Sequence, residues 1–252
     1  MSRLAAATLA ALLATSARAD EVFGQTEVPD QASPVPGQPN RFSSPISGSF
    51  EFQFGQYLPN VDSEFKNGAT PWKDAFGGSK GWLYQAGAAW ALYHGWGTLE
   101  VGGRIGYFQR NGFGFLVTGE KSGDPTKFHM IPTAATLTYR FDTLGNSGYA
   151  LPLAPYVRLA LERYNWWVTD GSGHTARSGA TNGWSAAGGL SLLLDLFDPD
   201  LARELDQETG INHTYLFAEA RKTSVDDFGS STSWILSDKS SVTWAFGILW
   251  VF

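Results

Sequence analysis

The sequence contains no cysteine, so neither disulfide bonds nor thiolate metal sites can support its fold. It also lacks a run of about 20 apolar residues, the length that a membrane-spanning helix requires. Charged residues make up only 17% of the chain, and acidic residues outnumber basic ones by 24 to 18, which argues against a nucleic-acid partner. Without disulfide bonds or thiolate metal sites, the stability of the fold must come from a large core or from lipid as the solvent.

Aromatic residues and glycine, by contrast, are abundant. The 252 residues include 10 Trp, 9 Tyr, 17 Phe and 29 Gly, yet the mean hydropathy is slightly negative, at −0.17. This mixture is typical of many strands that each have one apolar face. Because no internal repeat or long linker divides the sequence, we expect one folded domain.

Residues 1–19 have the pattern of a secretory signal peptide. A basic residue and a short apolar run precede the small-residue cleavage site Ala17-Arg18-Ala19. Residues 20–47 are rich in Pro, Gln and Ser and have no apolar periodicity, which predicts a flexible periplasmic leader. Residues 48–252 would then form the exported, folded domain.

Short segments of alternating hydrophobicity recur from Gly48 onward. In the first, Phe50, Phe52 and Phe54 alternate with Glu51 and Gln53. The predicted strands cover residues 50–54, 82–92, 99–107, 131–141, 153–162, 184–194, 216–221 and 241–252. The facing of residues 184–194 is ambiguous, because that segment is more uniformly apolar. The pattern predicts an all-β, antiparallel up-and-down transmembrane β-barrel of eight strands, or of ten if a long loop contains a hairpin.

The charged residues inside these segments all lie opposite the apolar face. A soluble sandwich would expose that face to water and would usually carry Lys there, whereas here Arg and Glu occur in equal numbers. Equal numbers of Arg and Glu are expected in a narrow lumen filled by side chains, because buried charges there must form ion pairs. The predicted lumen ion network consists of Glu51, Glu100, Arg104, Arg140, Arg158, Glu162, Glu219 and Arg221.

Connection lengths alternate in the way expected of a barrel with surface loops at one end and periplasmic turns at the other. Residues 58–81, 111–127, 165–182 and 222–239 are interpreted as long surface loops, and residues 93–97 and 142–150 as short turns. The connection 195–213 is the exception. There Asp198 as N-cap, Pro199 in the first turn and Gly210 as a stop predict one short periplasmic helix.

The chain ends on apolar residues at every second position: Phe246, Ile248, Trp250 and Phe252. This ending resembles the C-terminal signal that the barrel-insertion machinery of the outer membrane recognises. Aromatic residues near the strand ends are expected to form interfacial girdles. The residues assigned to the girdles are Trp82, Trp90, Trp96, Tyr107, Tyr139, Tyr164, Trp166, Trp167 and Trp250.

Four short sequence segments resemble segments found in a family of outer-membrane β-barrel proteins of myxobacteria and related deltaproteobacteria. They are Asn60-Val61-Asp62-Ser63-Glu64-Phe65, Tyr139-Arg140-Phe141-Asp142, Trp166-Trp167-Val168-Thr169-Asp170-Gly171 and Asn212-His213-Thr214-Tyr215-Leu216-Phe217. The similarity extends from about Gly48 to Phe252. It implies fold and location only, because the family has no assigned activity and no catalytic residue to carry over.

Candidate chemistry is sparse. Of the four histidines, His94 and His213 are expected at the periplasmic end, and His129 and His174 at the opposite end. His174 with Ser172 and Asp170 is the best candidate for a hydrolytic group, but Asp-Gly-Ser-Gly-His is also typical of a solvated turn. We therefore predict no catalytic residue, no metal ligand and no cofactor site, with a lipid hydrolase or acyltransferase as the enzymatic alternative.

The predicted surface loops carry acids and aromatic residues. Asp62 and Glu64 in the first loop, and Asp226 and Asp227 in the last, could bind divalent cations that bridge lipopolysaccharide, although solvated loop charge is the simpler interpretation. The loop aromatics could contact a hydrophobic ligand or partner, or simply pack over the barrel mouth. They are Phe65, Trp72, Phe76, Phe113, Phe115 and Trp234.

These observations predict an integral outer-membrane barrel with a structural, adhesive or envelope-maintenance role. Its expected partners are outer-membrane lipid, lipopolysaccharide and the barrel-insertion machinery, and nucleic acid is not among them. The alternative is a barrel that binds or transports small apolar solutes or lipids, and a lipid-modifying enzyme comes third. A lumen plugged by Arg and Glu favours the first, a continuous apolar tunnel the second.

Overall fold

The structure is a computed structural model that describes residues 46–65, 68–115, 121–142, 152–230 and 233–252. Within these ranges the side chains of residues 115, 121 and 122 are not described. The predicted signal peptide, and the predicted leader up to residue 45, lie outside the described residues.

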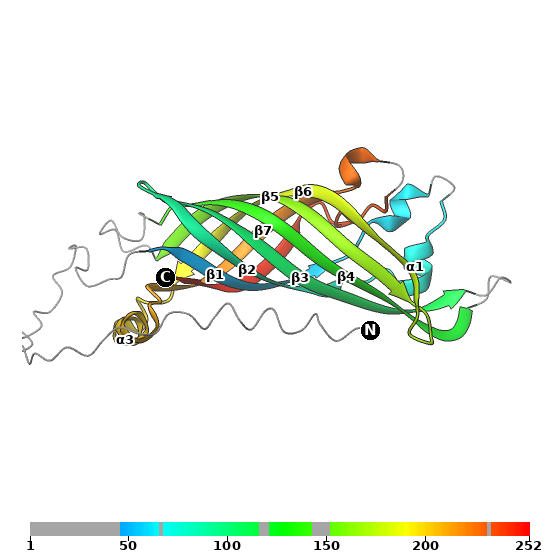
Figure 1. Ribbon diagram of the computed structural model, residues 1–252, viewed down its shortest axis with the longest axis horizontal. Coiled ribbons are helices and arrows are strands. Elements are labelled where there is room, and N and C mark those ends of the chain that lie inside the picture. The colour runs from blue at the N-terminus through cyan, green and yellow to red at the C-terminus, as the bar shows by residue number, and fades with distance from the viewer. Residues whose placement is uncertain (1–45, 66–67, 116–120, 143–151, 231–232) are drawn as a thin grey trace, which may run out of the picture. The chain divides into compact units, whose positions relative to one another are not determined.

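Eight antiparallel strands close into a barrel (Figure 1). Each strand pairs with its neighbour in sequence, and the first pairs with the last. The strands are β1 (Gly48–Tyr57), β2 (Gly81–His94), β3 (Thr98–Phe115), β4 (Lys121–Arg140), β5 (Leu153–Thr169), β6 (Thr175–Leu193), β7 (His213–Val225) and β8 (Thr243–Val251). The predicted up-and-down topology with eight strands is confirmed, and the ten-strand alternative is wrong.

The barrel is apolar outside, and the middle of its interior is polar. On β1, Phe50, Phe52 and Phe54 are exposed on the outer surface, whereas Glu51 and Gln53 between them are buried in the lumen. A closed barrel satisfies every strand hydrogen bond without water, and an apolar outer face requires lipid around it. The chain therefore folds as a transmembrane β-barrel. In the described ranges, no helix combines the length and the apolar character needed to cross a bilayer.

The same alternation settles the facing of β6, which the sequence left ambiguous. Trp184 and Leu190 are exposed on the outer surface, and Ser185 and Ser191 are buried inside. One part of the girdle prediction is wrong, because Tyr164 and Trp166 are buried inside the barrel. Both lie at even-numbered positions of β5, which face inward like Arg158 and Glu162.

Two stretches interpreted as surface loops are mostly strand. Residues 111–115 and 121–127 continue the β3–β4 hairpin, in which Asn111 pairs with Lys127 and Phe113 with Pro125. Residues 165–182 continue the β5–β6 hairpin, which turns at residues 170–174. The apolar alternation stops before the strands do, because outward residues beyond the lipid contact water and need not be apolar. Backbone pairing continues regardless.

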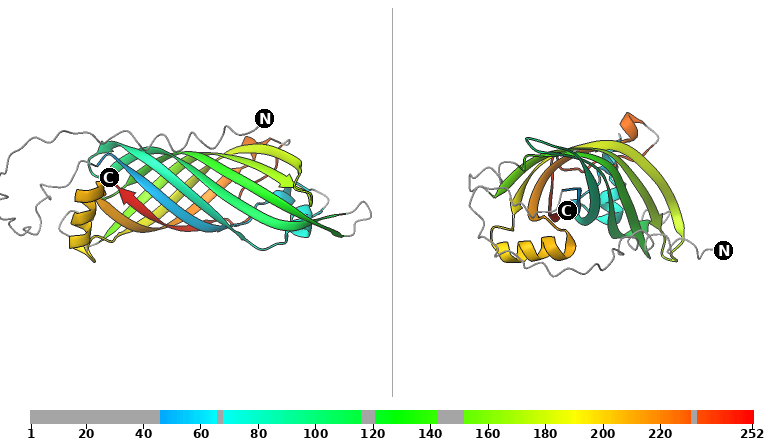
Figure 2. Two further views of the ribbon diagram at one scale, coloured as in Figure 1. Left: turned by 60° about the horizontal axis from the view of Figure 1, so that its bottom comes forward. Right: turned by 60° about the vertical axis from the view of Figure 1, so that its left-hand side comes forward.

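The two ends of the barrel carry different elements (Figures 1 and 2). At the proximal end, the C-terminus lies beside α3 (Pro199–Thr209), which connects β6 to β7. At the distal end, β1 and β2 are connected through the short helix η1 (Val61–Glu64) and α1 (Pro71–Phe76). A further short helix, η2 (Asp227–Gly229), follows β7.

The predicted helix after Asp198 is confirmed as α3. The Asp198 carboxylate accepts a hydrogen bond from the backbone N–H of Leu201 at 3.0 Å, Pro199 occupies the first turn, and Gly210 ends the helix in the left-handed conformation at φ 73°. α1 was not predicted. Its six residues are too few to show a helical period, and a contact distant in sequence holds its first turn, as described below.

Candidate functional site

The barrel lumen brings together all eight charged side chains of the predicted ion network. Each is at most 8% exposed. They come from five strands: Glu51 from β1, Glu100 and Arg104 from β3, Arg140 from β4, Arg158 and Glu162 from β5, and Glu219 and Arg221 from β7. Because four carboxylates face four guanidinium groups, the formal charges cancel inside the barrel.

Glu219 is the centre of this network. One carboxylate oxygen accepts hydrogen bonds from Nε and Nη2 of Arg221 at 2.8 and 2.5 Å. The other accepts from Nη1 of Arg158 at 3.0 Å and from the hydroxyl of Tyr156 at 3.2 Å. Arg104 approaches the carboxylate at 4.0 Å. Three cations thus surround one fully buried carboxylate.

The remaining ions pair around this centre. Arg158 donates to both oxygens of Glu51, at 3.0 and 2.6 Å. Arg104 pairs with Glu162 at 3.1 Å, and Arg140 with Glu100 at 2.9 Å at the proximal side. Uncharged side chains extend the network: Ser185 donates to Glu162, and Gln85 accepts from both Arg221 and Gln53. Charge-assisted bonds of this kind hold the side chains in place rather than leaving them free to carry ions.

Hydrophobic clusters close the lumen on both sides of the ion network. Toward the proximal end, Tyr156, Leu193, Tyr215, Phe217 and Leu249 pack together with Ala154 and Val251. Toward the distal end, a larger cluster fills the barrel mouth. Its members are Tyr57, Leu58, Val61, Trp72, Leu83, Phe108, Phe128, Met130, Tyr164, Trp166, Val225 and Leu236. The lumen is therefore filled by side chains, as eight-stranded barrels require.

The distal cluster is tied to the loops above it. The hydroxyl of Tyr57 donates to the backbone oxygen of Leu236, and the ring of Tyr57 meets Phe108 edge-on at 5.0 Å. Trp72 of α1 meets Phe128 of β4 edge-on at 4.8 Å. These contacts hold α1 and the 233–242 segment against the barrel rim.

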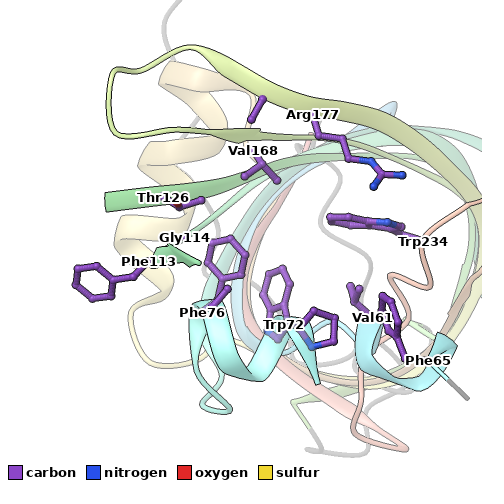
Figure 3. Close-up of a pocket in the computed structure, with 13 residues that line it drawn as sticks. Val61, Phe65, Trp72, Phe76, Phe113, Gly114, Thr126, Val168, Arg177 and Trp234 are labelled. Carbon is purple, nitrogen blue, oxygen red and sulfur yellow. The ribbon is translucent and has the colours of Figure 1, made fainter. Parts of the chain in front are cut away.

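A pocket of about 350 Å³ lies above this cluster, between α1, η1 and the distal ends of β3 to β6 (Figure 3). We call it the distal pocket. It is lined by Val61, Phe65, Pro71, Trp72, Ala75, Phe76, Phe113, Gly114, Thr126, Val168, Ala176, Arg177 and Trp234. The pocket includes five of the six loop aromatics singled out in the sequence, and the side chain of the sixth, Phe115, is not described. Small-molecule sites in proteins are of this size and are similarly apolar.

Arg177 is the only charged residue among the described residues that line the distal pocket. Its guanidinium lies 5.4 Å from the ring centroid of Trp234, and Trp234 stacks on Trp166 at 4.1 Å. Figure 3 shows the Arg177 side chain over the Trp234 ring. Stacking fixes the cation at the pocket without neutralising it. The sequence did not single out Arg177, because it lies in a stretch without apolar alternation that was interpreted as a loop.

The loop acids proposed as cation ligands instead hold the distal segments together. The Asp62 carboxylate accepts hydrogen bonds from the backbone N–H groups of Trp72 and Lys73, at 2.7 and 3.2 Å, and so fixes the first turn of α1. Glu64 accepts from the backbone N–H of Ile235. No group of three or more His, Asp or Glu side chains in the described ranges is arranged to hold a metal ion.

Asp227 connects η2 to β6. Its carboxylate accepts hydrogen bonds from the side-chain amide of Asn182 at 2.8 Å and from the hydroxyl of Ser233 at 3.3 Å. The hydrogen bond from the Asn182 side chain stabilises the charged form and lowers the pKa of Asp227 from its ordinary value. Through these hydrogen bonds, the Asp227 carboxylate links the distal loops to β6.

The histidines do not form the hydrolytic group considered from the sequence. The Asp170 carboxylate accepts hydrogen bonds from the backbone N–H groups of Ser172 and His174, at 3.0 and 2.9 Å, which is how an aspartate stabilises a turn. His94 lies in the β2–β3 turn region next to Thr98, and His213 at the start of β7 contacts Asp195 at 2.7 Å. His129 stacks on Trp167 at 5.1 Å on the outer face of the barrel.

Three residues of the predicted insertion signal lie in β8, and Phe252 directly follows it. Phe246 and Phe252 are exposed, and Trp250 stacks on Phe50 of β1 at 5.9 Å. The backbone oxygen of Phe252 accepts hydrogen bonds from the N–H groups of Ser47 and Gly48, at 2.6 and 2.8 Å. The C-terminal strand is thus part of the seam that closes the barrel.

Fold and site together define an eight-stranded transmembrane β-barrel with a filled lumen and an aromatic pocket at its distal end. No protein-family model matches the sequence. No curated protein matches it either.

Among the solved structures with a similar strand arrangement are two outer-membrane barrels. Neisserial surface protein A is 14% identical, with a TM-score of 0.45 over 82% of this chain and 97% of that chain. Ail, the attachment invasion locus protein of Yersinia pestis, solved with the heparin analogue sucrose octasulfate, is 10% identical, with a TM-score of 0.39 over 82% of this chain and all (100%) of that chain. These similarities are distant, and the functional proposals below depend on this chain's own residues.

Proposed function

We propose that this chain is a non-conducting, non-catalytic barrel of a bacterial outer membrane, with its distal end facing the cell exterior and a structural, adhesive or envelope-maintenance role. The observation that supports this proposal is the filled lumen. Glu219, Arg158 and Arg221 pair across the interior, and hydrophobic clusters close both sides. A barrel filled in this way offers no aqueous path, so its contacts with other molecules are made at its ends and outer wall.

Orientation follows from the elements at each end. The strand that begins at Gly48 and the C-terminus both lie at the proximal end. An exported chain with an even number of strands keeps both barrel termini on the periplasmic side. The distal end, with η1, α1 and the long β3–β4 and β5–β6 hairpins, is then extracellular, which favours the adhesive role among the three.

Outer-membrane lipid and lipopolysaccharide are the proposed partners of the outer wall. On β5, exposed Val157, Leu159 and Leu161 are followed in the distal direction by Arg163, which is also exposed. An arginine just beyond the apolar belt lies where the phosphate groups of the outer leaflet are expected, and guanidinium binds phosphate well. The exposed aromatic residues of β8 would be recognised by the barrel-insertion machinery. Membership of the myxobacterial barrel family is part of the same proposal.

Membrane fractionation and single-channel recording test this proposal. The full chain, expressed in a Gram-negative host, should be recovered with the outer membrane and should migrate differently in gels when boiled and unboiled. Its conductance in planar bilayers should stay at background. Recovery from the soluble periplasm with no mobility difference would overturn the location, and conductance clearly above background would overturn the closed lumen.

The adhesive role has its own test at the distal end. Cells that express the chain should attach to a test surface better than cells that express a Phe65→Ser/Phe113→Ser variant, because both side chains are exposed there. A Leu201→Ser variant of α3 is the matched control, since it also removes an exposed apolar side chain, but at the proximal end. Equal attachment by all three strains would contradict an adhesive role.

The second candidate function, binding of a small apolar solute or lipid, is favoured by one observation. The distal pocket exposes aromatic side chains at the water-facing end of a transmembrane barrel. Large contiguous apolar patches on the water-exposed surface of a protein mark sites of interaction with a ligand or a partner.

A further inference from the structure

We infer that the distal pocket binds a small anionic amphiphile, an apolar chain that ends in a carboxylate or phosphate group, with the anionic group against Arg177. The inference deepens the second candidate function and depends on the proposed orientation only for where the ligand comes from. Four features of the pocket support it: its lining, its one cation, a buried donor without a partner, and fixed walls.

The residues that line the pocket favour a ligand that is mostly apolar. Phe76, Val168 and Trp72 surround a space of about 350 Å³, and Phe65 and Phe113 at its edge are exposed to water. Burying such surfaces against a hydrocarbon chain releases them from water at about 25 cal/mol per Å². A polar ligand would gain nothing from these walls, so its body must be apolar.

The cation selects the charge of the head group. Arg177 stacks on Trp234, and within the described residues no carboxylate lies within ion-pair distance of its guanidinium. The N–H groups of Arg177 therefore remain able to donate to a ligand oxygen. Carboxylate and phosphate match this geometry, because a guanidinium binds both in a bidentate manner.

A buried donor adds an independent indication. Trp72 is 4% exposed and lines the pocket, yet its indole N–H has no hydrogen-bond partner in the described part of the chain. Buried donors are nearly always paired in folded proteins. The indole N–H of Trp166 in the same cluster is also without a partner in the described residues, but only Trp72 lines the pocket, where a ligand oxygen would supply its acceptor.

The walls are fixed before any ligand arrives. Asp62 holds the first turn of α1, and Glu64 holds the 233–242 segment, which carries Trp234, through the N–H of Ile235. The backbone of Asn60 also pairs with Ser237 at 2.9 Å. A pre-formed pocket loses less conformational entropy on binding, which favours a small ligand of modest area.

The test is a titration of the ¹⁵N-labelled chain in phosphatidylcholine nanodiscs with three probes of equal chain length: octanoate, octanol and octylammonium. The indole N–H resonances of Trp72 and Trp234, assigned with Trp→Phe variants, report binding at the pocket. Octanoate should shift both resonances saturably, with a dissociation constant about tenfold lower than octanol, the factor that one charge-assisted hydrogen bond supplies. Octylammonium should bind more weakly than octanol.

Two variants and one control separate the contributions. Arg177→Gln should bind octanoate and octanol about equally, and Ala75→Phe, which fills the pocket, should abolish the shifts for every probe. Arg203→Gln removes an exposed cation from α3 at the proximal end and should leave the octanoate preference unchanged. Unboiled gel mobility checks that each variant is folded.

Equal affinity for octanoate and octanol in the unaltered chain would overturn the assignment of the anionic head group. Shifts that survive Ala75→Phe, or that never saturate, would show partition into the lipid and overturn the site. Octyl phosphate in place of octanoate then distinguishes the two head groups. These results are independent of fractionation and conductance, so failure of this inference and failure of the proposed function are distinguishable.

Discussion

Glu219→Gln is the substitution that tests the lumen network most severely. Glu219 is fully buried and accepts hydrogen bonds from Arg158, Arg221 and Tyr156, with Arg104 at 4.0 Å. The amide keeps the size of the side chain but removes its charge, which leaves three guanidinium groups around a neutral centre. Removing one partner of a buried ion pair costs about 3–5 kcal/mol, so we expect the free energy of unfolding to fall by that amount.

The assay is a urea titration of the chain folded into phospholipid vesicles, with the folded fraction read from the mobility of unboiled samples. Asp200→Asn in α3 is the control, because its pair with Arg203 is largely exposed, at 90% and 49% of the side-chain surfaces. An exposed pair contributes at most about 1 kcal/mol. A loss below about 1 kcal/mol for Glu219→Gln as well would refute the central place given to the network, since it would match an exposed pair.

A compensating double substitution separates charge from packing. Glu219→Met combined with Arg221→Met removes one charge of each sign and restores the balance inside the barrel. Replacing both partners of a buried pair with apolar residues is often neutral, so the double variant should be more stable than Glu219→Gln alone. A double variant that is less stable would show that shape, rather than charge, limits the lumen.

Three further predictions concern other parts of the barrel. Gly183→Ala should destabilise the barrel by about 1–3 kcal/mol in the urea titration, because its Cβ would overlap the β7 backbone, whereas Gly188→Ala, with open space at its Cβ, should be neutral. Asp198→Ala should destabilise α3 by about 1 kcal/mol and speed amide exchange there without changing barrel mobility. Since the pKa of Asp227 is lowered in the folded state, its bond to Asn182 should stabilise the distal loops above the ordinary carboxyl range, and this stability should be lost as the pH falls through the folded pKa. Amide exchange at η2 should show that pH dependence, and Asn182→Ala should remove it.

The sequence predicted the parts of the fold that lipid constrains. Phe50, Phe52 and Phe54 must alternate with Glu51 and Gln53, because lipid lies on one side of the strand and the packed lumen on the other. The α3 helix was also predictable, because Asp198 and Gly210 form its caps locally.

The predictions from the sequence were wrong for the parts of the strands that extend beyond the lipid. Residues 111–114, 123–127, 165–169 and 175–182 belong to paired strands whose outward side chains contact water, so no period of two marks them. Tyr164 and Trp166 illustrate the related error, since an aromatic residue near a strand end was assigned to the girdle although its inward parity places it in the barrel mouth. Counting parity from Arg158 would have placed both correctly.

The distal pocket was only partly predictable. Phe65, Trp72 and Trp234 stood out as aromatic residues in surface loops, but segments distant in sequence bring them together. The role of Arg177 could not be predicted from the sequence. Its position over Trp234 depends on how the β5–β6 hairpin packs against the 233–242 segment. Sites built from the ends of several strands are invisible to local patterns.

Labelling of single-cysteine variants on whole cells tests the central claim most directly, since the chain has no cysteine of its own. Ser172 lies in the β5–β6 turn at the distal end, Gln207 lies in α3 at the proximal end, and both are exposed. With a membrane-impermeant maleimide, Ser172→Cys should be labelled on intact cells, and Gln207→Cys only after the outer membrane is permeabilised. Labelling of Gln207→Cys on intact cells, with Ser172→Cys protected, would contradict the proposed orientation, and protection of neither would contradict a barrel that spans the outer membrane.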